Sequence, residues 1–270
     1  MPIGRLKNKV VLLTGACGLL GGSFCRAILE EGGKVVALDL RTEDLLEMKS
    51  TISVAHAASF YALAVDLTDE VALGNALSEL PPSFRPNCLV NNAAINPKVE
   101  DGELTDNSIE SISKFRWEFE LGVGLWGAFS VSRAFSALLS RGDSGGSIVN
   151  IGSDYAHLAP NQGLYLSEGT LENPAIKPVT YSVMKHGVIG LTRYLAAYWA
   201  GASIRVNTLS PGGILNNQSS AFKKSLSTQV PLGRLADVEE LKGALIFLLS
   251  DESSYMNGAE VVIDGGRAIW

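Results

Sequence analysis

The sequence predicts a doubly wound α/β fold, with about seven parallel strands and helices on both faces of the sheet. Short apolar runs rich in Val, Ile and Leu alternate with longer segments of helical period along the whole chain. These runs are apolar on both faces, which is typical of strands buried between two layers of helices. Because strand and helix alternate repeatedly, the strands must be parallel and joined by crossover connections.

The apolar runs are the expected strands, at residues 9–14, 34–40, 60–66, 87–92, 146–153, 203–210 and 259–264. The segments between them are the expected helices, at residues 19–31, 43–56, 69–80, 107–140, 180–200 and 237–250. The last helix has the best-defined start. Asp237 is followed three residues later by Glu240, which is the pattern of a capping box.

Composition favours one soluble domain over residues 1–270 and excludes several functional classes. The net charge of -6 and the pI near 5.2 argue against binding of nucleic acid or of an anionic membrane, since both require a basic surface. The chain starts without a cleavable signal pattern, and no apolar run reaches the roughly 18 residues that span a bilayer, so we expect a cytoplasmic protein. The cysteines and histidines lack metal-like spacing, and we expect no metal.

Two irregular regions are expected to border a ligand, because each follows the carboxyl end of a strand. Residues 160–178 are the predicted substrate lid, and residues 211–231 are the predicted substrate loop. The lid carries polar side chains suited to a hydroxylated substrate, namely Asn161, Gln162, Tyr165, Glu168, Glu172 and Lys177.

A glycine-rich turn follows the first expected strand. In TGACGLLG, Gly15, Gly18 and Gly21 allow a tight turn, close approach of the backbone to a pyrophosphate, and close packing of the next helix. Asp39 ends the second expected strand, where a carboxylate accepts hydrogen bonds from an adenosine ribose and repels a 2′-phosphate. The pattern therefore favours NAD over NADP, although Arg41 nearby weakens this preference.

Tyr181 and Lys185 stand four residues apart in the segment YSVMK, so they share one face of the expected helix. One interpretation is an ordinary, partly exposed helix. The other is an acid–base group, because a nearby ammonium favours the phenolate and lowers the pKa of the tyrosine toward neutrality. The pentapeptide alone leaves both interpretations open.

The chain resembles the short-chain dehydrogenase/reductase family across essentially its whole length. The motifs that carry the resemblance occur in the family's order: the glycine turn, Asp66-Leu67, Asn91-Asn-Ala-Ala94, the strand that ends in Ser153, the pair Tyr181 and Lys185, Asn207, Pro211-Gly212 and Asp264-Gly-Gly266. The resemblance implies a Rossmann-fold enzyme that moves a hydride between a nicotinamide and an alcohol or carbonyl carbon.

The resemblance also implies residue roles. Tyr181 is the expected general acid/base, Lys185 lowers its pKa and binds the nicotinamide ribose, and Ser153 binds the substrate oxygen. The implied cofactor contacts are Gly15, Gly18, Leu20, Gly21, Asp39, Asp66, Leu67, Asn91, Ala93, Tyr181, Lys185, Pro211, Gly212 and Ile214.

Three departures from the family pattern leave alternatives open. The glycine spacing TGxxGxxG is that of the branch acting on nucleotide sugars, so a sugar-nucleotide epimerase or dehydratase is an alternative; however, only 89 residues follow Tyr181, too few for a separate sugar subdomain. Gly124 stands where the family has an asparagine that orients a water beside the lysine, so a catalytically impaired, NAD-binding regulatory protein is another alternative.

The third departure is the interval of 28 residues between Ser153 and Tyr181, about twice the usual length. The inserted lid and the phrase KPVTYSVMKH resemble a branch associated with bacterial surface-glycan and flagellin modification. The expected substrate is therefore a polar, sugar-like alcohol or carbonyl compound. Because the helices of GLWGAFSVSRAFSALL and YLAAYWA usually pair subunits in this family, we also expect a homodimer or homotetramer.

Overall fold

A computed structural model describes residues 4–95, 107–139, 145–165 and 176–270. Its centre is a seven-stranded parallel sheet in the order β3-β2-β1-β4-β5-β6-β7. The strands are β1 (Val10–Thr14), β2 (Lys34–Asp39), β3 (Phe60–Ala64), β4 (Cys88–Asn91), β5 (Gly146–Ile151), β6 (Ile204–Pro211) and β7 (Glu260–Ile263). The predicted fold class is confirmed. Six of the expected strands contain an observed one, and β6 extends one residue beyond the expected strand at 203–210.

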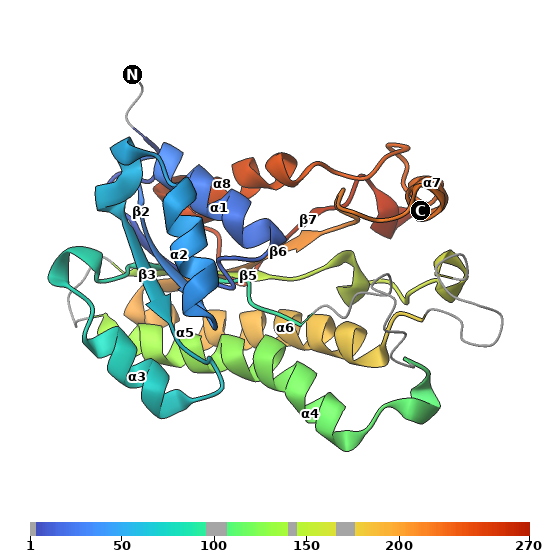
Figure 1. Cartoon of the computed structure of the whole chain (residues 1–270), viewed down its shortest axis with the longest axis horizontal. Coiled ribbons are helices and arrows are strands. Elements are labelled where there is room, and N and C mark those ends of the chain that lie inside the picture. The colour runs from blue at the N-terminus through green and yellow to red at the C-terminus, as the bar shows by residue number, and fades with distance from the viewer. Residues whose placement is uncertain (1–3, 96–106, 140–144, 166–175) are drawn as a thin grey trace.

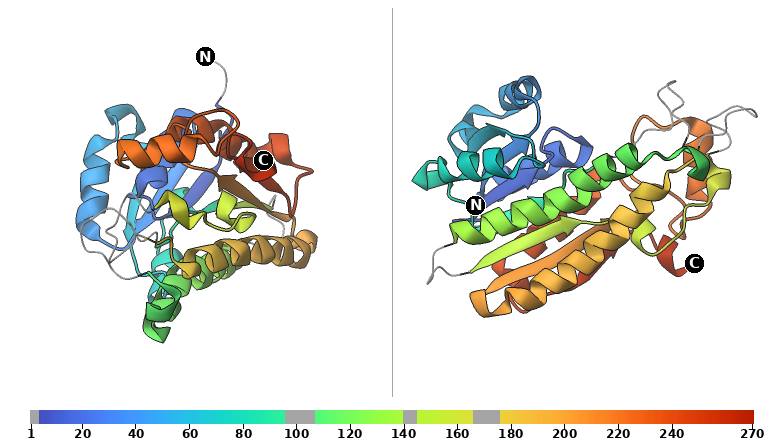
Figure 2. Two further views of the ribbon diagram at one scale, coloured as in Figure 1. Left: turned by 90° about the vertical axis from the view of Figure 1, so that its right-hand side faces the viewer. Right: turned by 90° about the horizontal axis from the view of Figure 1, so that it is seen from below.

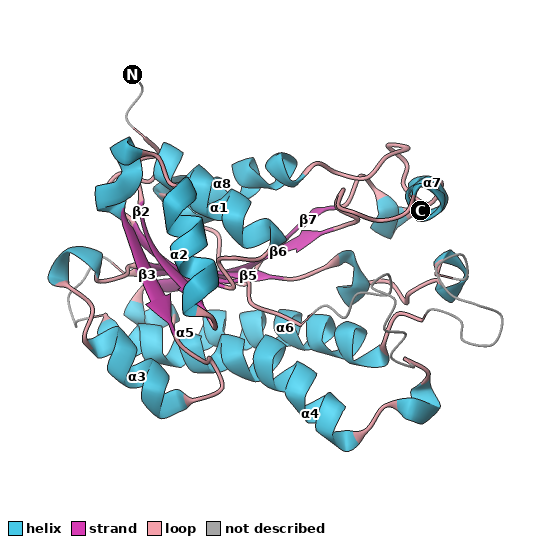
Figure 3. Ribbon diagram, in the orientation of Figure 1, coloured by secondary structure: helices cyan, strands magenta, loops and turns pink. Residues whose placement is uncertain are grey.

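The α-helices of the described residues cover both faces of this sheet, except α7, which lies apart beyond the ends of the strands (Figures 1 and 3). They are α1 (Leu19–Glu30), α2 (Thr42–Thr51), α3 (Glu70–Ser78), α4 (Lys114–Leu121), α5 (Gly127–Leu138), α6 (Val179–Tyr198), α7 (Ser220–Ser227) and α8 (Lys242–Leu249). In Figure 1, α1, α2 and α8 lie above the sheet, and α3, α5 and α6 lie below it.

Each face of the sheet has its own apolar core. Val11 and Leu13 of β1 belong to the core between the sheet and helices α1 and α8. Leu12, which lies between them in the chain, belongs to the core between the sheet and helices α3, α5 and α6. Successive side chains of a strand point to opposite faces, so a strand covered on both sides must be apolar throughout. This requirement explains why unbroken apolar runs predicted the strands.

Two helix predictions need correction. The expected helix at 107–140 begins at Lys114, and a π-helical turn at Gly122–Trp126 separates α4 from α5. The expected loop at 211–231 contains the helix α7, which sequence inspection missed. By contrast, the capping box of Asp237 and Glu240 is confirmed, although the first turn after it, Val238–Leu241, is a 3-10 turn that leads into α8.

The combined helix Lys114–Leu138 is, within the described residues, long and apolar enough to cross a membrane by length and composition, with 39% of its most apolar window buried. Val131 and Phe135 account for its inward side, because both are fully buried against the sheet. Seen from below in Figure 2, right, this helix and α6 run along each other beneath the sheet. Core helices of soluble proteins have the same apolar character.

The strand order reverses between β1 and β4, which are neighbours in the sheet although they are far apart in the chain. Such a reversal opens a crevice beyond the carboxyl ends of the strands, where ligands bind in doubly wound folds. At this point the backbones after the two strands approach closely. A Cβ on Gly15 would lie 2.8 Å from Cα of Ala93.

Candidate active site

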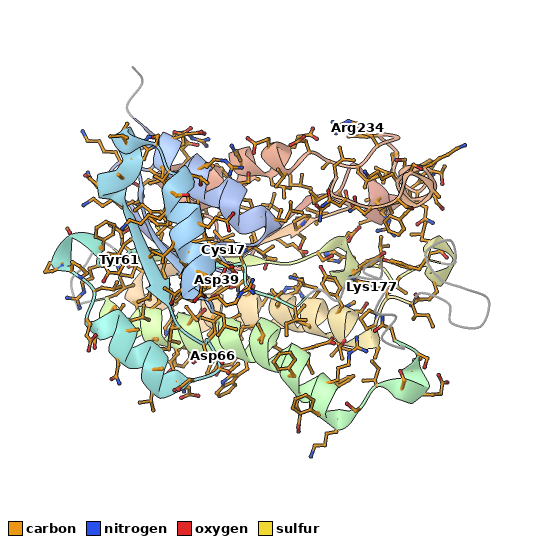
Figure 4. The ribbon with its side chains drawn as sticks, in the orientation of Figure 1. Cys17, Asp39, Tyr61, Asp66, Lys177 and Arg234 are labelled. Carbon is orange, nitrogen blue, oxygen red and sulfur yellow. The ribbon has the colours of Figure 1, made fainter. Side chains whose placement is uncertain are left out.

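A cavity of about 830 Å³ lies at the carboxyl ends of the strands. One end borders the turn between β1 and α1, together with Asp39 and Asp66. The other end borders Tyr181, the start of the insertion that follows β5, and the segment between β6 and α7. In Figure 4, Cys17 and Asp39 lie together at the first end, and Lys177 lies toward the second.

The glycine turn has the shape that an anion-binding turn requires. Gly15 has a φ of 61°, a left-handed conformation that favours glycine. A Cβ on Gly21 would lie 2.2 Å from the carbonyl oxygen of Gly15, so α1 packs directly on the turn. Gly18 caps α1 without a side-chain hydrogen bond, which leaves the first N–H groups of this 12-residue helix available to a phosphate.

The carboxylate of Asp39 lies beside this turn. Its oxygens accept hydrogen bonds from the backbone N–H groups of Cys17 and Leu40, both at 2.8 Å, and these bonds hold the carboxylate at the edge of the cavity. The guanidinium of Arg41 is turned to Asp44, with Nε 2.8 Å from the carboxylate. Gly15, Gly18, Asp39 and their neighbours thus fit the pyrophosphate and adenosine ribose of a dinucleotide.

Ser153, Tyr181 and Lys185 meet at the other end of the same cavity. Ser153 follows the end of β5, and its hydroxyl donates to Oδ1 of Asp154 at 3.0 Å. Tyr181 and Lys185 lie in the first turns of α6, where Nζ of Lys185 donates to the carbonyl oxygen of Ile151 at 2.7 Å. The ammonium also lies 5.6 Å from the centre of the Tyr181 ring. A hydroxyl, a phenol and an ammonium therefore line one cavity.

The pKa values of this pair differ from the sequence-based expectation. Burial raises the pKa of Tyr181 to about 12, and the nearby Ser153 hydroxyl only partly opposes this effect. Burial likewise lowers the pKa of Lys185 to about 8. In the protein alone, desolvation favours the neutral form of both groups, so the expectation that Lys185 brings the pKa of Tyr181 toward neutrality is wrong for this state.

Comparison with known proteins agrees with this geometry. A family model described as enoyl-(acyl carrier protein) reductase matches residues 16–268. Galactitol 2-dehydrogenase (L-tagatose-forming) of Cereibacter sphaeroides is 31% identical over 98% of this chain and 97% of its own. D-threitol dehydrogenase of Mycolicibacterium smegmatis is 31% identical over 98% of this chain and 95% of its own. The chain belongs to the short-chain dehydrogenase/reductase family.

Solved structures of such enzymes superpose over nearly the whole chain. A short-chain dehydrogenase of Leptospira borgpetersenii with bound NAD+ has a TM-score of 0.83 and 28% identity, covering 97% of this chain and 94% of that one. A gluconate 5-dehydrogenase of Burkholderia cenocepacia in complex with NADP and tartrate has a TM-score of 0.83 and 26% identity, covering 99% and 98%. A nicotinamide cofactor is common to both complexes.

Two of the residues expected to contact the cofactor in this short-chain dehydrogenase/reductase lie behind the cavity wall. Gly21 packs against the backbone of Gly15 and Ala16 in the turn. The buried amide of Asn91 donates hydrogen bonds to Ser132 at 2.9 Å and to Asn150 at 2.7 Å. The neighbouring Asn92 lines the cavity instead. The other expected residues all border the cavity: Gly15, Gly18, Leu20, Asp39, Asp66, Leu67, Ala93, Ser153, Tyr181, Lys185, Pro211, Gly212 and Ile214.

Sequence inspection missed a buried ion pair beside Ser153. The guanidinium of Arg267, close to the carboxyl end of the chain, contacts Oδ2 of Asp154 at 2.7 Å, and both side chains are almost fully buried. Since Oδ1 of Asp154 accepts from Ser153, the arginine holds the serine in place through one carboxylate. No motif marks this pair, because its members are 113 residues apart.

The structure also gives a packing reason for Gly124. This residue lies in the π-helical turn, and a Cβ there would come within 1.8 Å of Sδ of Met184. Met184 is the residue between Tyr181 and Lys185 that points into the core rather than into the cavity. The missing asparagine side chain is thus coupled to the choice of methionine in YSVMK.

The two irregular regions predicted to border the substrate pack against each other. A small apolar cluster joins Leu164 and Tyr165 of the insertion to Phe222 and Leu226 of α7, with Leu235 beside them. Tyr165 also donates to or accepts from the hydroxyl of Tyr155 at 3.0 Å. Glu168 and Glu172, which were expected to contribute polar groups, lie outside the described residues.

Proposed function

We propose that the chain interconverts a secondary alcohol and a carbonyl group on a polar, sugar-like substrate, with a nicotinamide dinucleotide as the redox partner. The observation that carries this proposal is the convergence of Ser153, Tyr181 and Lys185 at one end of a cavity whose other end is a phosphate-binding turn. The polyol specificity in the names of the relatives supports the substrate class. The residue roles are part of the proposal.

Tyr181, Ser153 and Lys185 have separate roles in the proposed reaction. A nicotinamide held in this cavity would supply hydride transfer to and from the carbon that bears the substrate oxygen. Tyr181 takes the hydroxyl proton in oxidation and gives it back in reduction, while the Ser153 hydroxyl donates a hydrogen bond to the same oxygen. The ammonium of Lys185, 5.6 Å from the centre of the Tyr181 ring, favours the phenolate as it forms.

The cofactor preference we propose is NAD over NADP. The Asp39 carboxylate beside the turn repels a 2′-phosphate, and Arg41 is engaged by Asp44. Asp39→Ser should lower the ratio of kcat/KM for NAD to that for NADP by about tenfold or more, because a like-charge contact is removed. The exposed Glu47→Gln serves as the control; equal ratios in all three proteins would refute this preference.

We further propose a cytoplasmic homodimer or homotetramer, one dehydrogenase domain spanning residues 1–270, a lid at 160–178 and a substrate loop at 211–231. Support for the assembly comes from an apolar hollow on the outer side of α4, α5 and α6. It is lined by Trp117, Leu121, Leu125, Trp126, Phe129, Leu191 and Tyr194. Trp126 is 43% exposed and Tyr194 65% exposed, which favours a face covered by a second copy of the chain.

Gly124 was the feature that favoured a catalytically silent NAD-binding protein. Its contact with Met184 supplies a packing reason for glycine at this position, so an active enzyme remains the better explanation. A sugar-nucleotide epimerase or dehydratase is disfavoured because the chain aligns with polyol dehydrogenases over 98% of its length.

The test is turnover by the purified protein. NADH absorbance is followed with NAD and a panel of polyols, aldonates and polyol phosphates, and the same panel is offered to Tyr181→Phe. Removal of the phenolic proton should lower kcat/KM by about 100- to 10,000-fold, while NAD binding is retained. The exposed Tyr198→Phe, on the same helix, should keep full activity. Tight NAD binding by the wild type without turnover of any compound would favour the silent protein.

A further inference from the structure

Two tyrosine hydroxyls meet at the end of the cavity that holds Tyr181. The hydroxyl oxygens of Tyr155 and Tyr165 lie 3.0 Å apart, which is the distance of one hydrogen bond, and both residues line the cavity. Each side chain is buried, with 7% of Tyr155 and 6% of Tyr165 exposed. Tyr155 lies in the 3-10 turn that follows Ser153, and Tyr165 directly follows the 3-10 turn Gln162–Leu164 of the insertion. The contact therefore joins the insertion to the turn beside the candidate catalytic serine.

The ring of Tyr155 is fixed by two buried groups of the site. It stands edge-on to the ring of Tyr181, with 6.3 Å between the ring centres. The guanidinium carbon of Arg267 lies 5.1 Å from the centre of the Tyr155 ring, and Asp154 holds that guanidinium through an ion pair. Such edge-on and cation–ring contacts favour one orientation of the ring. Tyr155 is thus a fixed neighbour of the proposed acid–base group, Tyr181.

The ring of Tyr165 is fixed by apolar packing against α7. Its centre lies 5.3 Å from the ring centre of Phe222, and both rings belong to the apolar cluster between the insertion and α7. Apolar contacts hold the ring, while the hydroxyl has a polar partner in Tyr155. The position of this hydroxyl is therefore set by two segments of the chain, the insertion and α7.

The pair of hydroxyls can form more hydrogen bonds than the one that joins it. A phenol hydroxyl has one O–H donor and an oxygen that accepts, so a bond between two phenols uses one of their two donors. Burial lowers the pKa of Arg267, but Asp154 and Tyr155 outweigh burial and raise it. Because a guanidinium offers only N–H donors, its attraction to the Tyr155 oxygen favours an O–H of Tyr155 that points to Tyr165. Among the described residues, this leaves the O–H of Tyr165 as the donor that is available to a ligand in the cavity.

The pair suits an uncharged partner. Burial raises the pKa of Tyr165, and its contact with Tyr155 raises it further, so the hydroxyl stays protonated at neutral pH. A neutral phenol both donates and accepts hydrogen bonds, so it matches an alcohol hydroxyl, which has the same two functions. Since the pair is buried, a substrate analogue without the matching hydroxyl leaves a donor without a partner, and a site of this kind strongly rejects such analogues.

We infer that Tyr155 and Tyr165 form a specificity-determining site that binds a second hydroxyl of the substrate, on a carbon next to the carbinol carbon. This inference rests on the proposed function and narrows its substrate class to compounds with vicinal hydroxyls. The rings of Tyr155 and Tyr181 are in edge contact, so a substrate whose reacting oxygen is bound by Tyr181 has its neighbouring carbons beside the pair. Tyr165 donates to the second hydroxyl, and Tyr155 orients Tyr165 for this bond.

The experiment uses a series of four-carbon alcohols, each with one kind of secondary carbinol. Threitol has a hydroxyl on both carbons next to the carbinol, butane-1,2,4-triol on one of them, and butane-1,3-diol on neither, while all three keep the more distant terminal hydroxyl. Initial rates with NAD are measured for both enantiomers of each compound. The proteins are the wild type, Tyr155→Phe, Tyr165→Phe, the double variant, and Tyr255→Phe, which removes the hydroxyl of an exposed tyrosine and serves as the matched control.

The wild type should lose about 10- to 100-fold in kcat/KM at one step of the series, and that step identifies the hydroxyl that is bound. In Tyr165→Phe this step should shrink to about threefold or less, while butane-1,3-diol keeps its kcat/KM. Tyr255→Phe should keep the step of the wild type. An equal loss for all three compounds in Tyr165→Phe would mean that the hydroxyl only supports the fold and would overturn the inference, as would a wild type without the step.

The double variant tests whether the two tyrosines act together. Tyr155→Phe should lower kcat/KM for the preferred compound by about 3- to 10-fold, because Tyr165 keeps its hydroxyl but loses the partner that orients it. Tyr155→Phe combined with Tyr165→Phe should lose no more than Tyr165→Phe alone, since both changes remove one and the same contact with the substrate. Losses that multiply in the double variant would contradict the role given to Tyr155.

A binding measurement separates this inference from the proposed function. Saturation-transfer-difference NMR, which detects weak ligands, gives the affinity of threitol and butane-1,3-diol for the wild type and Tyr165→Phe in the presence of NAD. Tighter binding of threitol that is lost in Tyr165→Phe supports the inference even if neither compound is oxidised, in which case the proposed reaction fails alone. Oxidation of all three alcohols by the wild type at similar rates leaves the reaction intact and refutes the role of the pair, as does equal or absent binding of both compounds.

Discussion

The two ends of the cavity consist of different kinds of chemical group. The cofactor end consists of a glycine turn, backbone N–H groups at the start of α1, and Asp39 at the end of β2. The substrate end consists of buried charged side chains, with Lys177 and Lys185 close to the ring of Tyr181 and an ion pair beside Ser153. The first end offers backbone N–H groups and a tight turn to a ligand, and the second end offers charged side chains.

This difference has an energetic consequence. Folding of a glycine turn has a small electrostatic free-energy cost, because its N–H groups can face solvent or a phosphate. Burial of an ammonium group is destabilising, since desolvation disfavours its charged form. We therefore expect the buried charges at the substrate end to lower the stability of the fold. The glycine turn at the cofactor end should have little effect on it. Substitutions at the two ends should separate these properties.

The largest effect is expected from Arg267→Met. Loss of the arginine leaves Asp154 charged and buried without its partner, which should lower the free energy of unfolding by about 3–5 kcal/mol and weaken the hold on Ser153. Urea denaturation measures the first effect and kcat the second. The control is Arg234→Met, which breaks a surface ion pair with Glu240 and should change stability little. A loss no larger than that of the control would show that the buried pair is not structural.

Gly21→Ala tests the cofactor end. The new Cβ would meet the carbonyl oxygen of Gly15, so the turn must move, at about 1–3 kcal/mol of stability. NAD binding, followed by calorimetry, should weaken by about tenfold or more as the phosphate site distorts. In Gly74→Ala, on α3, the new Cβ meets open space, and stability should rise by about 0.5–1 kcal/mol. Unchanged NAD affinity in Gly21→Ala would contradict the shape-based account.

The smallest effect is a pH dependence at the substrate end. Lys177 and Lys185 each have a pKa of about 8 in the folded protein against an ordinary value of 10.5. Between these values the unfolded chain binds more protons, so the free energy of unfolding should rise with pH from about 8 to 10. Above pH 10 the raised pKa of Tyr181 acts in the opposite direction, because the folded protein keeps a proton that the unfolded chain loses.

Lys177→Met should remove part of that rise and stabilise the protein at pH 7 by about 1–3 kcal/mol, since one buried charge is gone. Urea denaturation from pH 7 to 10, without cofactor, measures both changes. Lys224→Met, which removes an exposed lysine of α7, should leave the profile of the wild type. If Lys177→Met were less stable than the wild type at pH 7, the lysine would already be balanced by its surroundings, and the contrast between the two ends would weaken.

The fold and most of the cofactor end could be predicted because they depend on neighbours in the chain. Strands covered on both faces must be apolar, and a turn that contacts phosphate must be rich in glycine, so both leave local patterns. Ser153, Tyr181 and Lys185 could also be predicted from the sequence. Tyr181 and Lys185 form a local pattern, because they are one helix turn apart. Their shared position at one cavity end follows from the strand order.

Other features depend on contacts between distant segments and leave no local pattern. The π-helical turn at Gly124 exists beside Met184, and α7 is short and buries only one side, against Leu164 and Tyr165. Asp154 and Arg267 meet only after β5 and the end of the chain are brought together. The sequence by itself determined the sheet, the turn and the identity of the candidate reacting groups. Only the tertiary structure decided which charges are buried beside them, because burial is a property of the whole packed chain, and with it the pKa values of Tyr181 and both lysines.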